Sequence, residues 1–103
     1  MQPNKYGFYP KEWDDMQHIF KKYSEIEEVI LFGSRAKQAF KKASDVDIAI
    51  KGDNVTHDTI LHLQNDFEDS YIPYFFDVLR YSTISSGELK EHIRIFGVEI
   101  YKK

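Results

Sequence analysis

The stretch that most constrains this chain runs from Ile30 to Ile50, ILFGSRAKQAFKKASDVDIAI. The apolar residues before Gly33 predict a buried strand that ends at this glycine, after which the chain can enter a helix at Ser34 and Arg35. Free N–H groups and the positive end of the helix dipole gather at such a helix start. This turn is therefore suited to holding a phosphate group.

Two aspartates, Asp45 and Asp47, follow on either side of Val46 in a second apolar stretch. Alternate side chains of a strand point to the same face, so both carboxylates share one face while Val46 and Ile48 are buried on the other. At about 3.3 Å per residue their Cα atoms lie roughly 6.6 Å apart, a span suited to one or two divalent ions. An isolated Asp-x-Asp pair in a strand more often lies on an exposed surface without binding a metal. In this sequence, the distance of the pair from the turn at Gly33 favours a metal site.

A third carboxylate, Asp77, stands in the apolar segment Tyr74 to Leu79. Burying it without a partner would be costly, and a cation shared with Asp45 and Asp47 would supply one. Three close carboxylates repel one another, which raises at least one pKa, and a divalent ion relieves this repulsion. Magnesium suits carboxylate, water and triphosphate oxygens.

Together, these residues resemble the motifs of a known family. Gly33-Ser34-Arg35 followed by Ser44-Asp45-Val46-Asp47 resembles the signature of the DNA polymerase beta-like nucleotidyltransferase superfamily, and the short chain resembles its minimal nucleotidyltransferase (MNT) branch. Asp77 matches the third carboxylate that the family carries on a later strand. The segment from Ile93 to Tyr101 is similar to the helix, glycine and strand that close these domains. The resemblance covers nearly all of the chain after about Glu25.

The resemblance implies two sets of site residues. The nucleotide-binding set is Gly33, Ser34, Arg35 and Ser44. The catalytic and metal-binding set is Asp45, Asp47 and Asp77. The resemblance also implies two bound Mg²⁺ ions, and ATP as the donor of a nucleoside monophosphate. From the residues alone, Ser34 is also a candidate helix cap, and Arg35 is either a surface cation or a group that orients phosphate or a carboxylate.

The connector between the two halves of the signature departs from the family at Gln38, where many relatives carry a glycine. Lys37, Lys41 and Lys42 also lie in this loop. They are either part of a solvated connector or help to hold the triphosphate. We expect the loop to be mobile without a ligand.

The acceptor of the nucleotide is expected on another chain, because larger members of the superfamily carry extra helices for it and this sequence ends after the catalytic core. Minimal nucleotidyltransferases are commonly paired with a small helical HEPN-type RNase, which they inhibit, in some cases by attaching AMP to a tyrosine. The first hypothesis is therefore an antitoxin that transfers AMP to a HEPN-type partner. Two alternatives stay open: a non-catalytic binding antitoxin, and a small-molecule nucleotidyltransferase that acts as a homodimer.

Composition excludes several other classes. A chain of 103 residues is expected to form one domain, 1–103. A net charge of −3 argues against bulk binding of nucleic acid. The absence of cysteine excludes disulfides and thiolate metal sites. No apolar run is long enough for a membrane span and no signal peptide stands out, so the cytoplasm is the expected location.

The spacing of apolar residues predicts alternating helices and strands, hence an α/β (α+β) fold with a small mixed sheet packed against helices. The expected strands are Glu28–Phe32, Asp45–Ile50, a segment around Asp77, and a final strand from Val98. The expected helices run from Pro10 to about Ser24, from a cap at Thr56, and from a cap at Ser85 to Gly97. Residues 1–9 carry no periodic signal, and we expect them to be loose or bound to a partner. The histidines show no paired metal-binding spacing and are interpreted as surface or helix-face residues: His18, His57, His62 and His92.

Overall fold

A mixed four-stranded sheet forms the centre of the computed structural model, which describes residues 2–103. The strands lie in the order β3-β2-β1-β4. Their bounds are β1 (Glu28–Phe32), β2 (Val46–Lys51), β3 (Phe76–Arg80) and β4 (Val98–Lys102). β1 pairs antiparallel with β2 and β4, and β2 pairs parallel with β3. The expected fold class, a small mixed sheet packed against helices, is confirmed.

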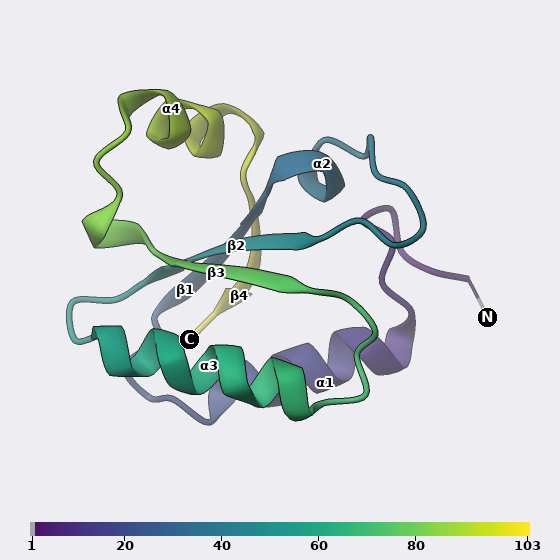
Figure 1. Cartoon of the computed structure of the whole chain (residues 1–103), viewed down its shortest axis with the longest axis horizontal. Helices are drawn as coiled ribbons and strands as arrows, with labels where there is room; N and C mark the ends of the chain where they lie inside the picture. Colours follow the sequence, from purple (N-terminus) through teal and green to yellow (C-terminus); the bar gives the residue numbers. More distant parts are fainter. Residues whose placement is uncertain (1) are drawn as a thin grey trace.

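Helices lie on both faces of this sheet (Figure 1). The helical segments are α1 (Pro10–Lys21), α2 (Gly33–Ala36), α3 (His57–Asp69), the short 3₁₀ turn η1 (Tyr81–Thr83) and α4 (Gly87–Phe96). Helices α1 and α3 lie together on one face, and α4 lies on the other, with α2 beside it (Figure 1). In residues 2–103, no helix combines the length and the apolar character that crossing a bilayer requires.

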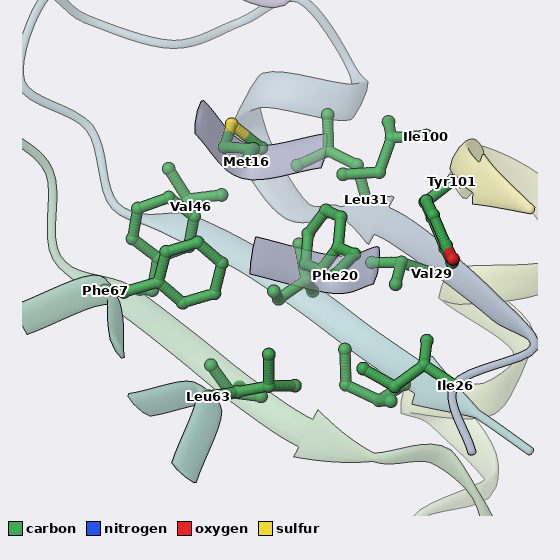
Figure 2. Close-up of a cluster of buried hydrophobic side chains, with 14 of the residues drawn as sticks. Met16, Phe20, Ile26, Val29, Leu31, Val46, Leu63, Phe67, Ile100 and Tyr101 are labelled. Carbon is green, nitrogen blue, oxygen red and sulfur yellow. The ribbon is translucent and has the colours of Figure 1, made fainter. Parts of the chain in front are cut away.

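The main core lies between the sheet and the pair α1 and α3. Its members come mainly from the sheet and from both of these helices, and Figure 2 shows how their side chains interlock, among them Met16, Phe20, Leu63, Phe67, Val29 and Leu31. A smaller cluster under α4 contains Ile30, Phe32, Ala49 and Ile93. Because successive residues of β1 point to opposite faces, the unbroken apolar run of this strand fills both clusters at once.

The helix boundaries differ slightly from those expected. Thr56 caps α3 as predicted, accepting a hydrogen bond from the Thr59 N–H at 3.3 Å. The cap of α4 is Ser86, which accepts from the Leu89 N–H at 3.2 Å, one residue after the predicted Ser85. Helix α1 ends at Lys21 and not near Ser24. These shifts of one to three residues are ordinary for helix ends.

The segment before Pro10 is packed against the domain, which differs from the loose or partner-bound segment that we expected for residues 1–9. Phe8 is 1% exposed and belongs to the main core. The Asn4 side chain accepts hydrogen bonds from the N–H groups of Tyr6 and Phe8, at 3.0 and 3.1 Å. A buried aromatic ring, a side-chain turn and a hydrogen bond from Arg35 to Tyr6 O hold this segment, and none of them produces a periodic pattern. Met1 lies outside the described residues.

Candidate active site

Three adjacent strands bring the predicted site residues to one end of the sheet. Phe32, the last residue of β1, pairs with Asp47 of β2, and Asp47 pairs with Asp77 of β3. Neighbouring strands lie about 4.8 Å apart, so the two aspartates are direct neighbours and the turn at Gly33 begins beside them. Asp45 precedes β2 by one residue and lies two residues before Asp47. All three aspartates therefore gather beside the Gly33 turn.

Position 33 requires a glycine for two reasons, its backbone conformation and the lack of space for a side chain. Its φ is +76°, in the left-handed region that residues with a Cβ rarely adopt. A Cβ at this position would also collide with the carboxylate of Asp47. The glycine therefore lets the phosphate-sized turn and a candidate metal ligand lie in direct contact.

The short helix α2 starts without a side-chain cap. Its N-cap residue is Phe32, and Ser34 is already the second helical residue, so the predicted helix-cap role of Ser34 is wrong. Among residues 2–103, no side chain accepts from the N–H groups of Ser34 or Arg35. The Gly33 N–H donates to Nε2 of His92 at 3.2 Å. The turn thus offers N–H donors in the place where the sequence predicted phosphate binding.

The fold makes the carboxylate of Asp47 harder to ionise than an ordinary aspartate. It is partly buried, whereas Asp45 and Asp77 are exposed. Burial raises the pKa of Asp47, the charges of Asp77 and Asp45 raise it further, and the electrostatic interaction with the nearby His92 ring lowers it. The sequence suggested that Asp77 would be the costly buried carboxylate. That expectation is wrong, because β3 is an edge strand and leaves this side chain open to solvent.

The residues present fit a magnesium ion that is bound together with a substrate. Carboxylate oxygens are the ligands that Mg²⁺ prefers, and the repulsion that raises the pKa of Asp47 is what a divalent ion would relieve. Within residues 2–103, no three Asp, Glu, His or Cys side chains lie close enough together to hold an ion without other ligands. Mg²⁺ is commonly held by one or two carboxylates plus substrate phosphates. A site completed by nucleotide oxygens therefore matches this geometry.

Arg35 and Ser44, which the resemblance assigned to nucleotide binding, make contacts within the protein. Arg35 is 1% exposed. Its Nε and Nη2 donate to the backbone oxygen of Ser44 at 3.1 and 2.8 Å, and its Nη1 donates to that of Tyr6 at 3.0 Å. The guanidinium carbon lies 4.2 Å from the ring centroid of Tyr74. The Ser44 hydroxyl accepts from the Lys41 N–H at 2.7 Å. Both side chains shape the connector in this structure.

The connector has a defined conformation that explains the unusual Gln38. This residue has a φ of +60°, which a glycine adopts without strain. The Gln38 N–H donates to Arg35 O at 3.0 Å and the Ala39 N–H donates to Ser34 O at 2.9 Å, the pair of bonds that closes a helix in a Schellman motif. The loop therefore keeps the shape that a glycine would favour. Of the nearby lysines, Lys37 places its Nζ 5.1 Å from the ring centroid of Phe96.

His92 is the site residue that the sequence did not reveal. It was interpreted as a surface or helix-face residue, yet it is partly buried and bonded to the Gly33 N–H. Its ring lies 6.2 Å from that of Phe32 and 5.2 Å from that of Phe96, between centroids. No local pattern marks this histidine, because its partner lies 59 residues away along the chain.

The family model "Polymerase beta, Nucleotidyltransferase" matches residues 14–103. No match was found among curated proteins.

Several solved structures share the fold. A chain of a toxin-antitoxin crystal structure with AMP-PNP has a TM-score of 0.73 and 16% identity, over 88% of this chain and 73% of that chain. A chain of a mutant MntA-HpeT toxin-antitoxin structure has a TM-score of 0.70 and 15% identity, over 88% and 73%. A chain of the structure of a tri-AMPylated Shewanella oneidensis HEPN toxin with its MNT antitoxin has a TM-score of 0.66 and 15% identity, over 88% and 70%. At these identities the likeness concerns the fold.

Proposed function

The chain belongs to the polymerase beta nucleotidyltransferase family, and from this premise we propose that it transfers a nucleoside monophosphate, AMP from ATP, to a hydroxyl group of a partner protein. The observation that carries the proposal is the register that sets Asp47 between the Gly33 turn and Asp77. A phosphate-binding turn in contact with paired carboxylates is the arrangement that nucleotidyl transfer needs. We propose the cytoplasm, which contains ATP and magnesium, as the place of the reaction.

In the proposed donor complex, the turn and the carboxylates divide the triphosphate between them. The N–H groups of the Gly33 turn and the Ser34 hydroxyl hold the β- and γ-phosphates, which compensates their negative charge. Asp45, Asp47 and Asp77 would hold two Mg²⁺ ions together with phosphate oxygens. Bound magnesium would supply charge stabilisation at the entering and leaving oxygens.

The transfer itself is an in-line displacement at the α-phosphorus. The acceptor hydroxyl oxygen forms the new P–O ester bond, the bond between the α-phosphorus and the bridging oxygen to the β-phosphate breaks, and pyrophosphate leaves. The exposed carboxylate of Asp77 takes the hydroxyl proton, because it lies beside Asp47 at the open edge of the sheet. That edge is where an acceptor from another chain would approach.

For the acceptor we propose a tyrosine of a small helical HEPN-type protein, which makes this chain the antitoxin of a toxin-antitoxin pair. Support comes from the fold shared with chains of toxin-antitoxin structures, one of which contains an AMPylated HEPN toxin and an MNT antitoxin. A contact-only antitoxin and a homodimeric small-molecule enzyme predict different products, so one experiment separates the three.

The experiment follows labelled ATP in the presence of magnesium, with and without the protein encoded beside this one. We expect label on the partner protein, lost in Asp47→Asn and Asp77→Asn. Asp69→Asn, the same chemical change on the exposed end of α3, is the matched control and should transfer label normally. Inhibition of the partner that survives both site substitutions without any transfer would instead show a contact-only antitoxin. Label found in small molecules alone would show the homodimeric enzyme.

A further inference from the structure

His92 stands at the point where the proposed function needs a phosphate oxygen. Its Nε2 accepts the hydrogen bond of the Gly33 N–H at 3.2 Å. A backbone N–H has one hydrogen to donate, so the ring nitrogen and a phosphate oxygen cannot both take it in good geometry. Because Nε2 is the acceptor here, the ring proton sits on Nδ1 in this arrangement.

The ring is held in this place by its surroundings. It lies between Phe32, which precedes the turn, and Phe96 at the end of α4, with centroids 6.2 and 5.2 Å away. The next residue, Ile93, is 5% exposed and anchors α4 in the smaller core cluster. His92 is thus a packed contact between α4 and the turn, which a stronger acceptor has to displace.

We infer that His92 is a positioning residue that competes with the triphosphate for the Gly33 N–H, an inference that rests on the proposed function. Without nucleotide, the ring satisfies the N–H and holds the turn in shape. When a phosphate oxygen binds, the ring turns away and leaves the N–H to the anion, which is the stronger acceptor. Affinity for the triphosphate is therefore reduced by the hydrogen bond that must first be broken.

Two substitutions separate this competition from simple packing. His92→Phe keeps a ring against Phe32 and Phe96 but removes the acceptor, so binding of AMP-PNP with magnesium should tighten by about two- to tenfold, the worth of one hydrogen bond. His92→Gln keeps an acceptor oxygen and should stay near the wild-type affinity. The control His57→Phe changes an exposed histidine at the start of α3 and should have no effect.

The measurement is calorimetric titration of each protein with AMP-PNP and, separately, with inorganic tripolyphosphate, which carries no base. In transfer assays, His92→Phe should lower KM with kcat unchanged, because the lost bond opposes ground state and transition state equally. The Gly33 amide resonance should move in His92→Phe before any ligand is added. In the wild type, this resonance and those of the His92 ring should shift together as tripolyphosphate binds.

Equal affinity in wild type and His92→Phe would overturn the inference, as would weaker binding in His92→Phe, which would make the ring a direct phosphate contact. A His92 ring that is unmoved while tripolyphosphate shifts Gly33 would also overturn it, and this wild-type test needs no variant to fold. Absence of binding in every protein, wild type included, would overturn the proposed function together with the inference.

Discussion

At the scale of single residues, the ionised form of the Asp47 carboxylate is destabilised by its surroundings. This carboxylate is partly buried, faces two other carboxylates, and has a raised pKa for both reasons. The protein tolerates this cost because a cation bound with the nucleotide would relieve it. Function and stability should therefore oppose each other at this position.

Asp47→Asn is expected to stabilise the protein without ligand while lowering kcat about 100-fold or more. Because the folded-state pKa lies above the usual value of 3.8, the folded state binds more protons than the unfolded state between these two values. The contribution of Asp47 to wild-type stability therefore falls as pH rises through this window and stays lower above it. The asparagine variant lacks this loss. Chemical denaturation at several pH values measures the difference.

The gain in unfolding free energy from Asp47→Asn should be present at pH 7 and vanish below the usual aspartate value. Magnesium with AMP-PNP should reverse the order, since ligand binding then stabilises only the wild type. Asp69→Asn, on the exposed end of α3, should show neither effect. A gain that persists unchanged at acid pH would contradict the electrostatic explanation.

At the scale of elements, the four-residue helix α2 begins at one left-handed residue and is followed by another. Gly33 opens it with a φ of +76° and Gln38 follows its end with a φ of +60°. The glycine is required by the contact with Asp47, whereas the glutamine is only strained. An L-residue in the left-handed region destabilises the folded state by roughly 1–2 kcal/mol. A residue that adopts this conformation without strain is therefore expected to stabilise the protein at position 38.

Gln38→Gly should raise the free energy of unfolding by about 0.5–1 kcal/mol, because relief of the left-handed strain exceeds the entropy that a glycine loses on folding. Lys37→Gly is the matched control: Lys37 has a φ of −78°, so the same substitution one residue earlier should destabilise by about 1 kcal/mol. Urea denaturation compares the two. Equal losses in both variants would show that the backbone at Gln38 is not left-handed in solution.

At the scale of the whole molecule, Arg35 ties together parts of the chain that are far apart in sequence. One guanidinium binds the backbone of Tyr6 in the N-terminal segment and of Ser44 in the connector, and it lies against the ring of Tyr74. The guanidinium group can make these contacts at once because it is planar and carries several N–H donors. A lysine has only a single ammonium group and cannot reproduce them all. The folded N-terminal segment therefore depends on this side chain.

Arg35→Lys should lower the free energy of unfolding by about 1–3 kcal/mol, since at least one of these charge-assisted bonds is lost. The N-terminal segment should also become sensitive to limited proteolysis. Arg94→Lys is the control, because Arg94 is exposed and pairs with Glu91 of its own helix. If stability were unchanged and affinity for AMP-PNP fell instead, Arg35 would bind the nucleotide as the resemblance implies.

The elements and the fold class could be predicted from the sequence because they depend on local patterns. Apolar spacing marked the strands and helices, Thr56 marked a cap, and Gly33 marked a turn. The alternation of side chains along a strand predicts that Asp45 and Asp47 share one face. Such signals come from residues within a few positions of one another, so one sequence is sufficient to identify them.

The tertiary structure decided which distant residues meet. The parallel pairing of β2 with β3 places Asp77 beside Asp47. Arg35 is buried and is therefore not a surface cation. The packing of α4 places His92 within hydrogen-bond distance of the Gly33 N–H. Phe8 joined the core in the same way. These contacts depend on register and packing between segments far apart in the chain. The sequence by itself thus determined the turn and the carboxylate pair, whereas long-range packing decided how they are joined and what occupies the turn.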